Sequence, residues 1–310
     1  MRVCVLGGGP DAEREVSVRS AANIARALAQ AEGFEVALRI VDDLTVEEAE
    51  AIEADVVWPA LHGPWGEGGP VQSLLEQAGK RFVGSASRAA RLAMDKLATK
   101  LAAASLGVAT PPAALVRRDD AACPFEFPCV VKPVHEGSTI GLWVCSDEQQ
   151  WREARDAALR REGPCMVEPF VKGRELTVGL VQRREGAAVQ WRALPTIEIV
   201  PAEGLYDYEA KYSRCDTRYA LSPPLPAGCE EELRVWSLRL VEALGCASLA
   251  RVDFILDDAG NAVLLELNTM PGFTEHSLLP MAAEAEGMSV RALCASLVEL
   301  AAERCGTVVA

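Results

Sequence analysis

The stretch "LLELNTMPG", residues Leu264–Gly272, places a carboxylate and an amide inside an otherwise apolar strand pattern. Glu266 and Asn268 are two residues apart, so in a strand their side chains point to the same side. In the preceding stretch "ARVDFIL", Arg251 and Asp253 share a face in the same way. The turn "DDAGN" between the two stretches predicts an antiparallel hairpin that brings these four polar side chains together.

Such a polar face requires a compensating positive charge, because unpaired buried carboxylates are costly. Arg251 could supply that charge within a structural network. Alternatively, Asp253, Glu266 and Asn268 offer only oxygen atoms, which is the ligand set of a hard divalent cation. Mg²⁺ usually keeps water and phosphate ligands in addition to those from the protein. A site with only three protein ligands therefore predicts a nucleoside triphosphate nearby. Two cations bridged by Glu266 would fit the same set.

The composition indicates a globular protein of two or three compact units. The chain has 310 residues, of which 50% are hydrophobic and 25% charged. Its 31 Lys and Arg residues against 45 Asp and Glu residues give a formal charge of −14. That charge repels phosphodiester backbones and anionic lipid, so we expect neither nucleic acid nor a membrane as partner.

The ten cysteines form no C-x-x-C pair and no Cys/His cluster at metal-ligand spacing, which is typical of reduced thiols. No run of about 18 apolar residues occurs, and the apolar run in "MRVCVLGGGP" is too short for a signal peptide. We therefore expect a cytoplasmic protein.

Periodicity along the chain predicts three units. Residues 1–90 alternate strands and helices as in an open α/β domain, and residues 91–182 form a small α+β unit. Residues 183–310 contain the polar hairpin. The pattern predicts one helix over residues 88–106 and another that ends at Gly245. The Tyr-rich segment 204–226 has no clear periodicity, and its length is typical of a lid loop.

The first glycine loop admits two interpretations. Gly7, Gly9 and Ala12 fit the G-x-G-x-x-G/A fingerprint of a dinucleotide-binding enzyme, which binds pyrophosphate at a helix N-terminus. However, three carboxylates crowd the same turn, those of Asp11, Glu13 and Glu15. They oppose an anion and favour a cation such as a substrate ammonium, although each is also typical of ordinary helix capping.

Two further motifs suggest where a nucleotide would bind. "KPVHEGSTIGL" places Lys132 at a strand end before a flexible loop whose N–H groups and hydroxyls can close over phosphates. "VEPFVKGRE" suits an adenine and ribose region, with Glu168 and Glu175 as acceptors and Phe170 and Val171 as apolar packing. Plain strand and turn structure explains the second motif equally well.

Taken together, these residues resemble the D-alanine-D-alanine ligases of the ATP-grasp superfamily. Corresponding motifs occur in order as "GGGPDAEREVS", "PALHGPWGE", "AMDKLATK", "VVKPVHEGSTIG", "VEPFVKGRELTV", "YDYEAKY", "ARVDF" and "LLELNTMPGFTEHSL". The resemblance implies a three-domain ATP-grasp fold of mixed α/β (α+β) class and a cytosolic enzyme, usually dimeric, for peptidoglycan synthesis. It would join two D-alanines through an acyl phosphate, using ATP and two Mg²⁺ or Mn²⁺ ions.

The resemblance also implies roles for individual residues. The first substrate would contact Glu13, Ser138, Tyr212 and His62. The nucleotide would contact Lys96, Lys132, Glu168, Phe170, Val171, Glu175 and Lys211, and the metal ligands would be Asp253, Glu266 and Asn268. Arg251 and the Gly272 N–H would stabilise the tetrahedral intermediate. Ser277 and the Leu278 N–H would bind the carboxylate of the second substrate.

Other interpretations stay open. Ser277 also fits a plain helix cap, and His62 also fits a loop histidine with a structural partner. Tyr212 favours D-alanine over D-lactate as acceptor, whereas departures from the family pattern at Gly68, His135, Leu205 and Phe273 affect the packing of the pocket. A ligase for another amino-acid or peptide pair, a non-catalytic nucleotide or amino-acid sensor, and an NAD enzyme are the alternative functions.

Overall fold

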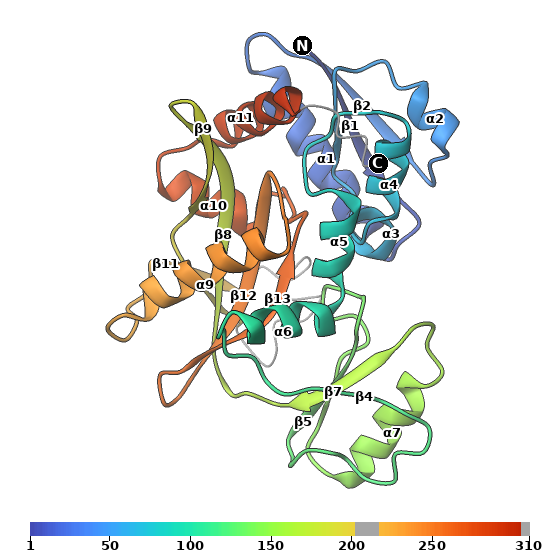
Figure 1. Ribbon diagram of the computed structural model, residues 1–310, viewed down its shortest axis with the longest axis vertical. Coiled ribbons are helices and arrows are strands. Elements are labelled where there is room, and N and C mark those ends of the chain that lie inside the picture. Colours follow the sequence, from blue (N-terminus) through green and yellow to red (C-terminus); the bar gives the residue numbers. More distant parts are fainter. Residues whose placement is uncertain (202–216, 305–310) are drawn as a thin grey trace.

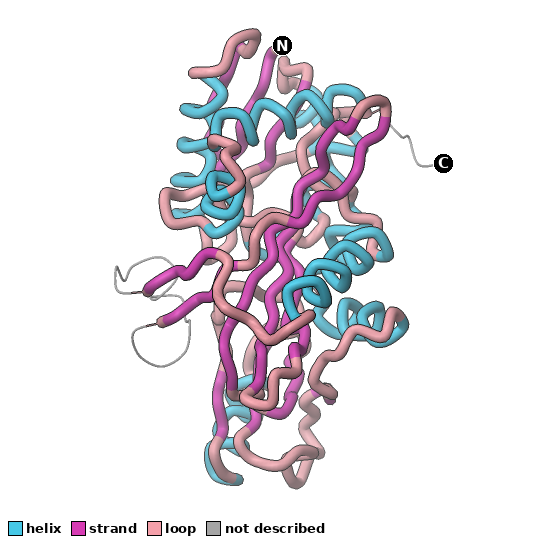
Figure 2. The backbone as a smooth tube through the Cα atoms, turned by 90° about the vertical axis from the view of Figure 1, so that its left-hand side faces the viewer, coloured by secondary structure: helices cyan, strands magenta, loops and turns pink. Residues whose placement is uncertain are grey.

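The computed structural model describes residues 1–201 and 217–304, and within them three separate sheets. In Figure 1 the N-terminal sheet lies at the top, a four-stranded sheet lies at the bottom, and a six-stranded sheet lies between them. Figure 2 shows the long strands of the middle sheet extending along the long axis of the molecule. Sites between the sheets are therefore built from residues far apart in the sequence.

The N-terminal sheet is parallel, with the strand order β2-β1-β3. Glycines at the end of β1 allow a close approach of α1, because a Cβ on Gly7 would lie 2.6 Å from the Cβ of Ala21. The strands and helices of this part are β1 (Arg2–Gly8), α1 (Arg14–Ala29), β2 (Glu35–Val41), α2 (Val46–Glu50), β3 (Val56–Pro59), α3 (Gly63–Glu67) and α4 (Pro70–Gln77).

The single helix predicted over residues 88–106 is wrong, because the chain forms two helices, α5 (Ser87–Met94) and α6 (Lys96–Ser105). Asp95 adopts an extended conformation between them, and its carboxylate accepts hydrogen bonds from the N–H groups of Leu97 and Ala98. Asp95 therefore caps α6. This break turns α6 so that Lys96 lies at the start of a helix beside the polar hairpin.

The four-stranded sheet is antiparallel, with the order β4-β7-β5-β6. Helix α7 packs against β5 and β6, and the fully buried Trp151 anchors it there. The elements are β4 (Ala114–Leu115), β5 (Cys129–Pro133), β6 (Trp143–Cys145), α7 (Glu148–Ala158) and β7 (Cys165–Pro169).

The six-stranded sheet is also antiparallel and has the order β11-β10-β8-β12-β13, with β9 paired to β8. Its elements are β8 (Gly173–Glu185), β9 (Ala188–Ala193), β10 (Ile197–Val200), β11 (Arg218–Leu221), α9 (Cys229–Ala243), β12 (Leu249–Asp257), β13 (Ala262–Asn268), α10 (Leu278–Ala285) and α11 (Val290–Glu303). The predicted hairpin is confirmed as β12 and β13, and the predicted helix before Gly245 is α9.

One sequence expectation differs from this arrangement. Strand β11 forms inside the segment 204–226 that has no evident periodicity, because pairing with β10 supplies the order that local sequence lacks. The predicted domain boundaries at 90/91 and 182/183 stay predictions, and the second would fall inside β8.

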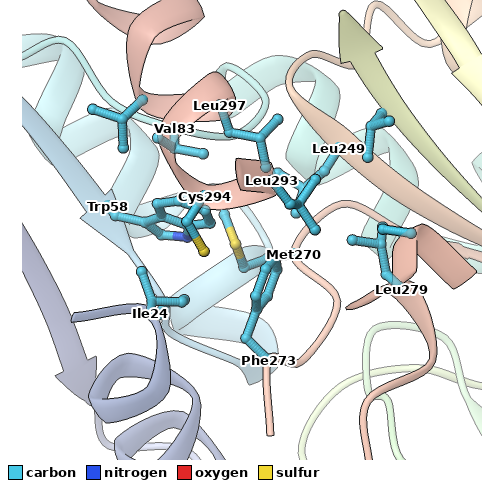
Figure 3. Close-up of a cluster of buried hydrophobic side chains, with 14 of the residues drawn as sticks. Ile24, Trp58, Val83, Leu249, Met270, Phe273, Leu279, Leu293, Cys294 and Leu297 are labelled. Carbon is cyan, nitrogen blue, oxygen red and sulfur yellow. The ribbon is translucent and has the colours of Figure 1, made fainter. Parts of the chain in front are cut away.

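A shared core fixes the N-terminal sheet to the rest of the molecule. Figure 3 shows side chains from α1, β3, α10 and α11 packed around Met270 and Phe273. Phe273 meets Trp58 edge to face, with ring centroids 5.4 Å apart. The chain thus returns from β13 to the N-terminal sheet, and the loop that follows Asn268 is held against α1 and β3.

The cysteines of the described ranges are free, and most are buried. Burial raises the pKa of the Cys294 thiol to about 12, so it behaves as an apolar core side chain. Across the same ranges no helix is both long and apolar enough to cross a membrane.

Candidate active site

The β12–β13 hairpin places the four polar side chains together as the sequence predicts. Asp253 pairs with Glu266 and Arg251 pairs with Asn268 in the antiparallel register. On the opposite face, Val252 and its neighbours on alternate positions lie fully buried against α9. A polar face and an apolar face therefore share the same two strands.

A β-bulge modifies this alternation at a position that sequence periodicity did not indicate. The register shifts between Asp253 and Phe254, so that Phe254 pairs with Leu264 and the β13 strand carries one extra residue. Leu264 and Leu267 are consequently both buried in the core, whereas Leu265 and Glu266 both line a pocket. The bulge is what allows Glu266 to sit in this strand without entering the core.

Each polar group of the hairpin has a protein partner. Arg251 donates two hydrogen bonds to Asp253, at 2.9 and 2.8 Å, and Thr177 from β8 donates a third at 2.6 Å. Glu266 lies 3.3 Å from the Lys96 ammonium. The side-chain oxygen of Asn268 accepts from the N–H of Met270 at 2.8 Å. Protein cations thus balance both carboxylates.

The first pocket lies between the four-stranded and six-stranded sheets. Its walls are apolar, and polar groups gather at one side. It is lined by Lys96, Pro111, Val130, Lys132, Pro133, Glu136, Gly137, Thr139, Ile140, Leu142, Val144, Glu168, Pro169, Phe170, Val171, Glu175, Asp253, Ile255, Leu265 and Glu266. Of the residues predicted to bind nucleotide, the six in the described ranges lie here, whereas Lys211 lies outside those ranges.

Glu168 forms the centre of a buried ion triad in this pocket. Its carboxylate contacts Lys132 through one oxygen and Lys100 at 2.7 Å through the other. Burial alone would raise the pKa of Glu168, but the two ammonium groups outweigh burial and lower it. For Lys100 the balance is reversed, since burial lowers its pKa more than Glu168 raises it. The lowered pKa of Glu168 keeps its carboxylate ionised.

Lys100 was not predicted as a site residue. It also donates to the hydroxyl of Thr110 at 3.0 Å and to the carbonyl of Pro111 at 2.8 Å. The sequence signal was available, because Lys100 follows Lys96 by four residues and the two therefore share a helix face. Only the folded chain, which brings Lys100 of α6 to Glu168 of β7, identifies this partner.

The loop between β5 and β6 closes one side of the pocket. Ser138 and Thr139 have positive φ angles of 53° and 64°, which turn the chain sharply. Lys96 donates to the carbonyl of Glu136, and Arg161 forms an ion pair with the Glu136 carboxylate at 2.5 Å. These contacts hold the loop against α6 and against the segment that follows α7.

The second pocket adjoins the first, and Gly137 and Glu266 line both. It lies among the N-terminal loops, the hairpin face and the loop that precedes α10. It is lined by Glu13, His62, Glu67, Gly137, Ser138, Arg251, Glu266, Asn268, Gly272, Thr274, His276, Ser277 and Leu278. The residues predicted to bind amino-acid substrates lie here, except Tyr212, which falls outside the described ranges.

The predicted acidic turn is only partly correct. Glu13 is buried in the second pocket and accepts a hydrogen bond from the Ser138 hydroxyl. Asp11 instead accepts from the N–H groups of Trp65 and Gly66 in α3, and Glu15 is exposed on α1. The charge of Asp11 therefore serves the loop structure, and Glu13 is the single carboxylate of that turn that reaches the pocket.

His62 is buried and neutral. Its Nε2 lies 3.3 Å from the Ser20 hydroxyl, which also accepts from the N–H of Phe273 at 3.0 Å. Burial, helped by the nearby Arg251, lowers the pKa of His62 to about 4, although a hydrogen bond with the Met270 backbone acts in the opposite direction. His62 therefore presents an uncharged imidazole to the second pocket.

Ser277 lies immediately before α10, with Leu278 as the first residue of that helix. The Ser277 hydroxyl accepts from the N–H of Thr274 at 2.8 Å and lies 3.0 Å from the Thr274 hydroxyl. A Cβ on Gly272 would come within 3.0 Å of the Ser277 hydroxyl. The loop 272–277 thus curls around Ser277 at the positive end of α10.

Known proteins resemble this chain over nearly its whole length. Residues 37–85 match the family model described as "D-ala D-ala ligase N-terminus", and residues 114–299 match "D-ala D-ala ligase C-terminus". A D-alanine--D-alanine ligase of Syntrophotalea carbinolica is 42% identical over 290 residues, covering 93% of this chain and 92% of that protein. One of Stutzerimonas stutzeri is 41% identical over 303 residues, covering 96% and 93%.

Solved structures agree with these sequence matches. The Bacillus anthracis D-alanine--D-alanine ligase, solved in complex with ATP, superposes with a TM-score of 0.82 at 28% identity and covers 97% of this chain and 96% of its own. The Coxiella burnetii enzyme has the same fold, with a TM-score of 0.84 at 24% identity over 98% and 94% of the two chains. The fold class predicted from sequence is therefore confirmed, and the chain belongs to the D-alanine--D-alanine ligase family of ATP-grasp fold.

Proposed function

We propose that this protein joins two D-alanine molecules to D-alanyl-D-alanine in an ATP- and Mg²⁺-dependent reaction that supplies peptidoglycan synthesis. The observation that carries the proposal is the junction between the two pockets, where Glu266 and Gly137 line both. A phosphoryl donor in the first pocket would meet an amino-acid carboxylate in the second at that junction. Proximity of this kind is the main requirement of phosphoryl transfer.

In the first pocket, Phe170 and Val171 provide the apolar surface for an adenine ring. The Glu168 carboxylate, kept ionised by two lysines, accepts from its amino group, and Glu175 accepts from the ribose. Lys96 and Lys132 face the phosphates, together with the loop at Gly137. Lys211, from the segment outside the described residues, completes the nucleotide contacts in this proposal.

The hairpin provides the residues that would hold the metal. Asp253 and Glu266 oppose each other across the strands with Asn268 on the same face, and all three offer oxygen donors, which suit Mg²⁺ or Mn²⁺. Three protein oxygen donors would leave the remaining positions of such an ion to water and nucleotide phosphates. When bound, the two ions neutralise charge on the transferred phosphoryl group.

The second pocket would hold both amino acids. Glu13, fixed by Ser138, accepts the ammonium of the first D-alanine, and His62 and Tyr212 complete its site. Phosphoryl transfer to the carboxylate of that D-alanine gives an acyl phosphate and ADP. Ser277 and the Leu278 N–H hold the carboxylate of the second D-alanine, whose amine then attacks the carbonyl carbon.

Negative charge develops on the carbonyl oxygen during this attack. Arg251 and Gly272 border the pocket, and in this proposal the Arg251 guanidinium and the Gly272 N–H stabilise that charge. Collapse of the tetrahedral species expels phosphate and forms the peptide bond, while the attacking amine loses its proton. Neutral His62 adds no charge that would compete with the ammonium of the substrate.

The remaining expectations belong to the same proposal. A cytoplasmic location fits an enzyme that consumes ATP. We propose a homodimer, favoured by the exposed apolar side chains of Leu38 and Ile40 on the edge strand β2. Sedimentation of the purified protein tests this, and a monomer at micromolar concentration would contradict it.

The decisive experiment combines ATP, Mg²⁺ and D-alanine and identifies the product by mass. We expect ADP, phosphate and D-alanyl-D-alanine in equal amounts, and no ADP when D-alanine or Mg²⁺ is omitted. A panel of other D- and L-amino acids in the same assay separates this function from ligases for other pairs. Nucleotide binding with no dipeptide from any amino acid would refute the proposal.

A further inference from the structure

Glu67 is a buried carboxyl group of the second pocket for which the reaction above gives no role. It is the last residue of α3 and is only 5% exposed. It lines the pocket together with Glu13 and Arg251. A buried acid in a substrate pocket needs a partner, because desolvation of an isolated charge is costly.

The loop around Glu67 is built to keep it there. A Cβ on Gly66 would lie 2.6 Å from the Leu61 backbone, and one on Gly68 would lie 2.3 Å from the Pro64 carbonyl oxygen. Asp11 holds the same turn from outside the pocket through the N–H groups of Trp65 and Gly66. The absence of side chains on both flanking residues is therefore required for the tight turn that buries Glu67.

The two oxygens of Glu67 have different environments. Oε1 accepts a hydrogen bond from the N–H of Gly63 at 3.3 Å. Oε2 is fully buried, and no atom of the described residues donates to it. The cations nearest to the pocket are engaged elsewhere, since Arg251 holds Asp253 and Lys96 contacts Glu266. Burial and the neighbouring Glu13 raise the pKa of Glu67, and the charge of the nearby Arg251 offsets this rise only in part.

We propose that Oε2 of Glu67, together with the Glu13 carboxylate, receives the ammonium group of the first amino acid. One oxygen of Glu13 already accepts from Ser138. An ammonium has three N–H donors and gains from a second charged acceptor in a site shielded from water. Glu67 would thereby select α-amino acids over carboxylic acids of the same size. This inference deepens the proposed function and rests on it.

Glu67→Gln tests the assignment, because the amide keeps an acceptor for Gly63 and removes the charge. Initial rates of ADP release give separate KM values for the first and second D-alanine, and propionate, which lacks the amino group, serves as an inhibitor competing with the first. We expect the first KM to rise about 30-fold, as for loss of a hydrogen bond to a charged group. The second KM and the inhibition constant of propionate should change less than about threefold.

Asp11→Asn is the matched control, because it loosens the same turn without removing a pocket charge. It should alter D-alanine and propionate binding by the same factor. If Glu67→Gln does not fold, Glu67→Asp withdraws the oxygen while keeping the charge, and should also reduce the preference for D-alanine over propionate.

Three results would overturn the inference. Equal weakening of D-alanine and propionate in Glu67→Gln would assign Glu67 to loop structure. A rise confined to the second KM would assign it to the attacking amine, and unchanged constants would leave it no part in substrate binding. Failure of the wild-type protein to form dipeptide would instead contradict the proposed function, so the two failures are distinguishable.

Discussion

Replacement of Glu168 by Gln should destabilise the protein because it leaves two buried ammonium groups facing each other. The side chains of Lys100 and Lys132 are 7% and 10% exposed, and Glu168 is the carboxylate that both contact. Removal of one partner from a buried ion pair costs about 3–5 kcal/mol. We expect the free energy of unfolding to fall by this amount at pH 7. Urea unfolding followed by tryptophan fluorescence measures it, and the buried Trp151 on the same sheet contributes to that signal.

A second substitution tests whether the loss of stability comes from the unbalanced charge. Lys100→Met removes one of the two cations, so it should recover about half of the loss when combined with Glu168→Gln. Glu198→Gln is a suitable control, since Glu198 forms a comparable two-bond pair with Arg174 at a more exposed site. An exposed pair contributes below about 1 kcal/mol.

The pH dependence provides a further check. The folded-state pKa of Glu168 is lowered from the model-peptide value of 4.5, so its stabilising contribution is present above that pH and is lost as the pH falls through the folded-state pKa. The difference in the free energy of unfolding between wild type and Glu168→Gln should therefore become smaller below about pH 4.5. The reasoning would be refuted if the losses of unfolding free energy caused by Glu168→Gln and Lys100→Met were additive in the double variant. It would also be refuted if Glu168→Gln lost no more unfolding free energy than Glu198→Gln.

Three other predictions follow from the core and the second pocket. The folded-state pKa of His62 is about 4 against 6.5 for the free side chain, so folded wild type excludes a proton that the unfolded chain binds. Wild type should lose about 3 kcal/mol of stability between pH 6.5 and 4, and His62→Gln should remove that loss, as measured by unfolding at each pH. Leu297→Ala, in the core of Figure 3, should lower the free energy of unfolding by about 2–5 kcal/mol in urea titration, with substrate KM values unchanged. Ser277→Ala should raise the KM of the second D-alanine about tenfold in the ADP-release assay, whereas a change confined to the first KM would contradict its placement.

Much of the site could be predicted because its information is local. Residues two apart in a strand share a face, so Arg251 and Asp253, and likewise Glu266 and Asn268, were assigned to one surface before any packing was known. The turn between the strands then required antiparallel pairing, and the ordered motifs indicated the family. These features depend on backbone geometry over a few residues, which sequence alone determines.

Other features depend on contacts that form only in the folded chain. The break at Asp95 requires α6 to turn toward the hairpin, and Lys100 gains its role only because Glu168 arrives from a different sheet. Asp11 and Glu13 are two residues apart in one acidic turn, yet one caps α3 and the other enters the pocket. Local charge pattern cannot separate them, because the environment that distinguishes them comes from residues more than 50 positions away.

The sequence by itself therefore determined the family, the polar hairpin and most of the residues that line the two pockets. The tertiary structure decided which carboxylates are buried, which are paired with cations, and that Glu67 retains an oxygen without a donor among the described residues. The physical reason is that strand alternation is a property of the backbone, whereas desolvation and ion pairing depend on the distance between segments remote in sequence.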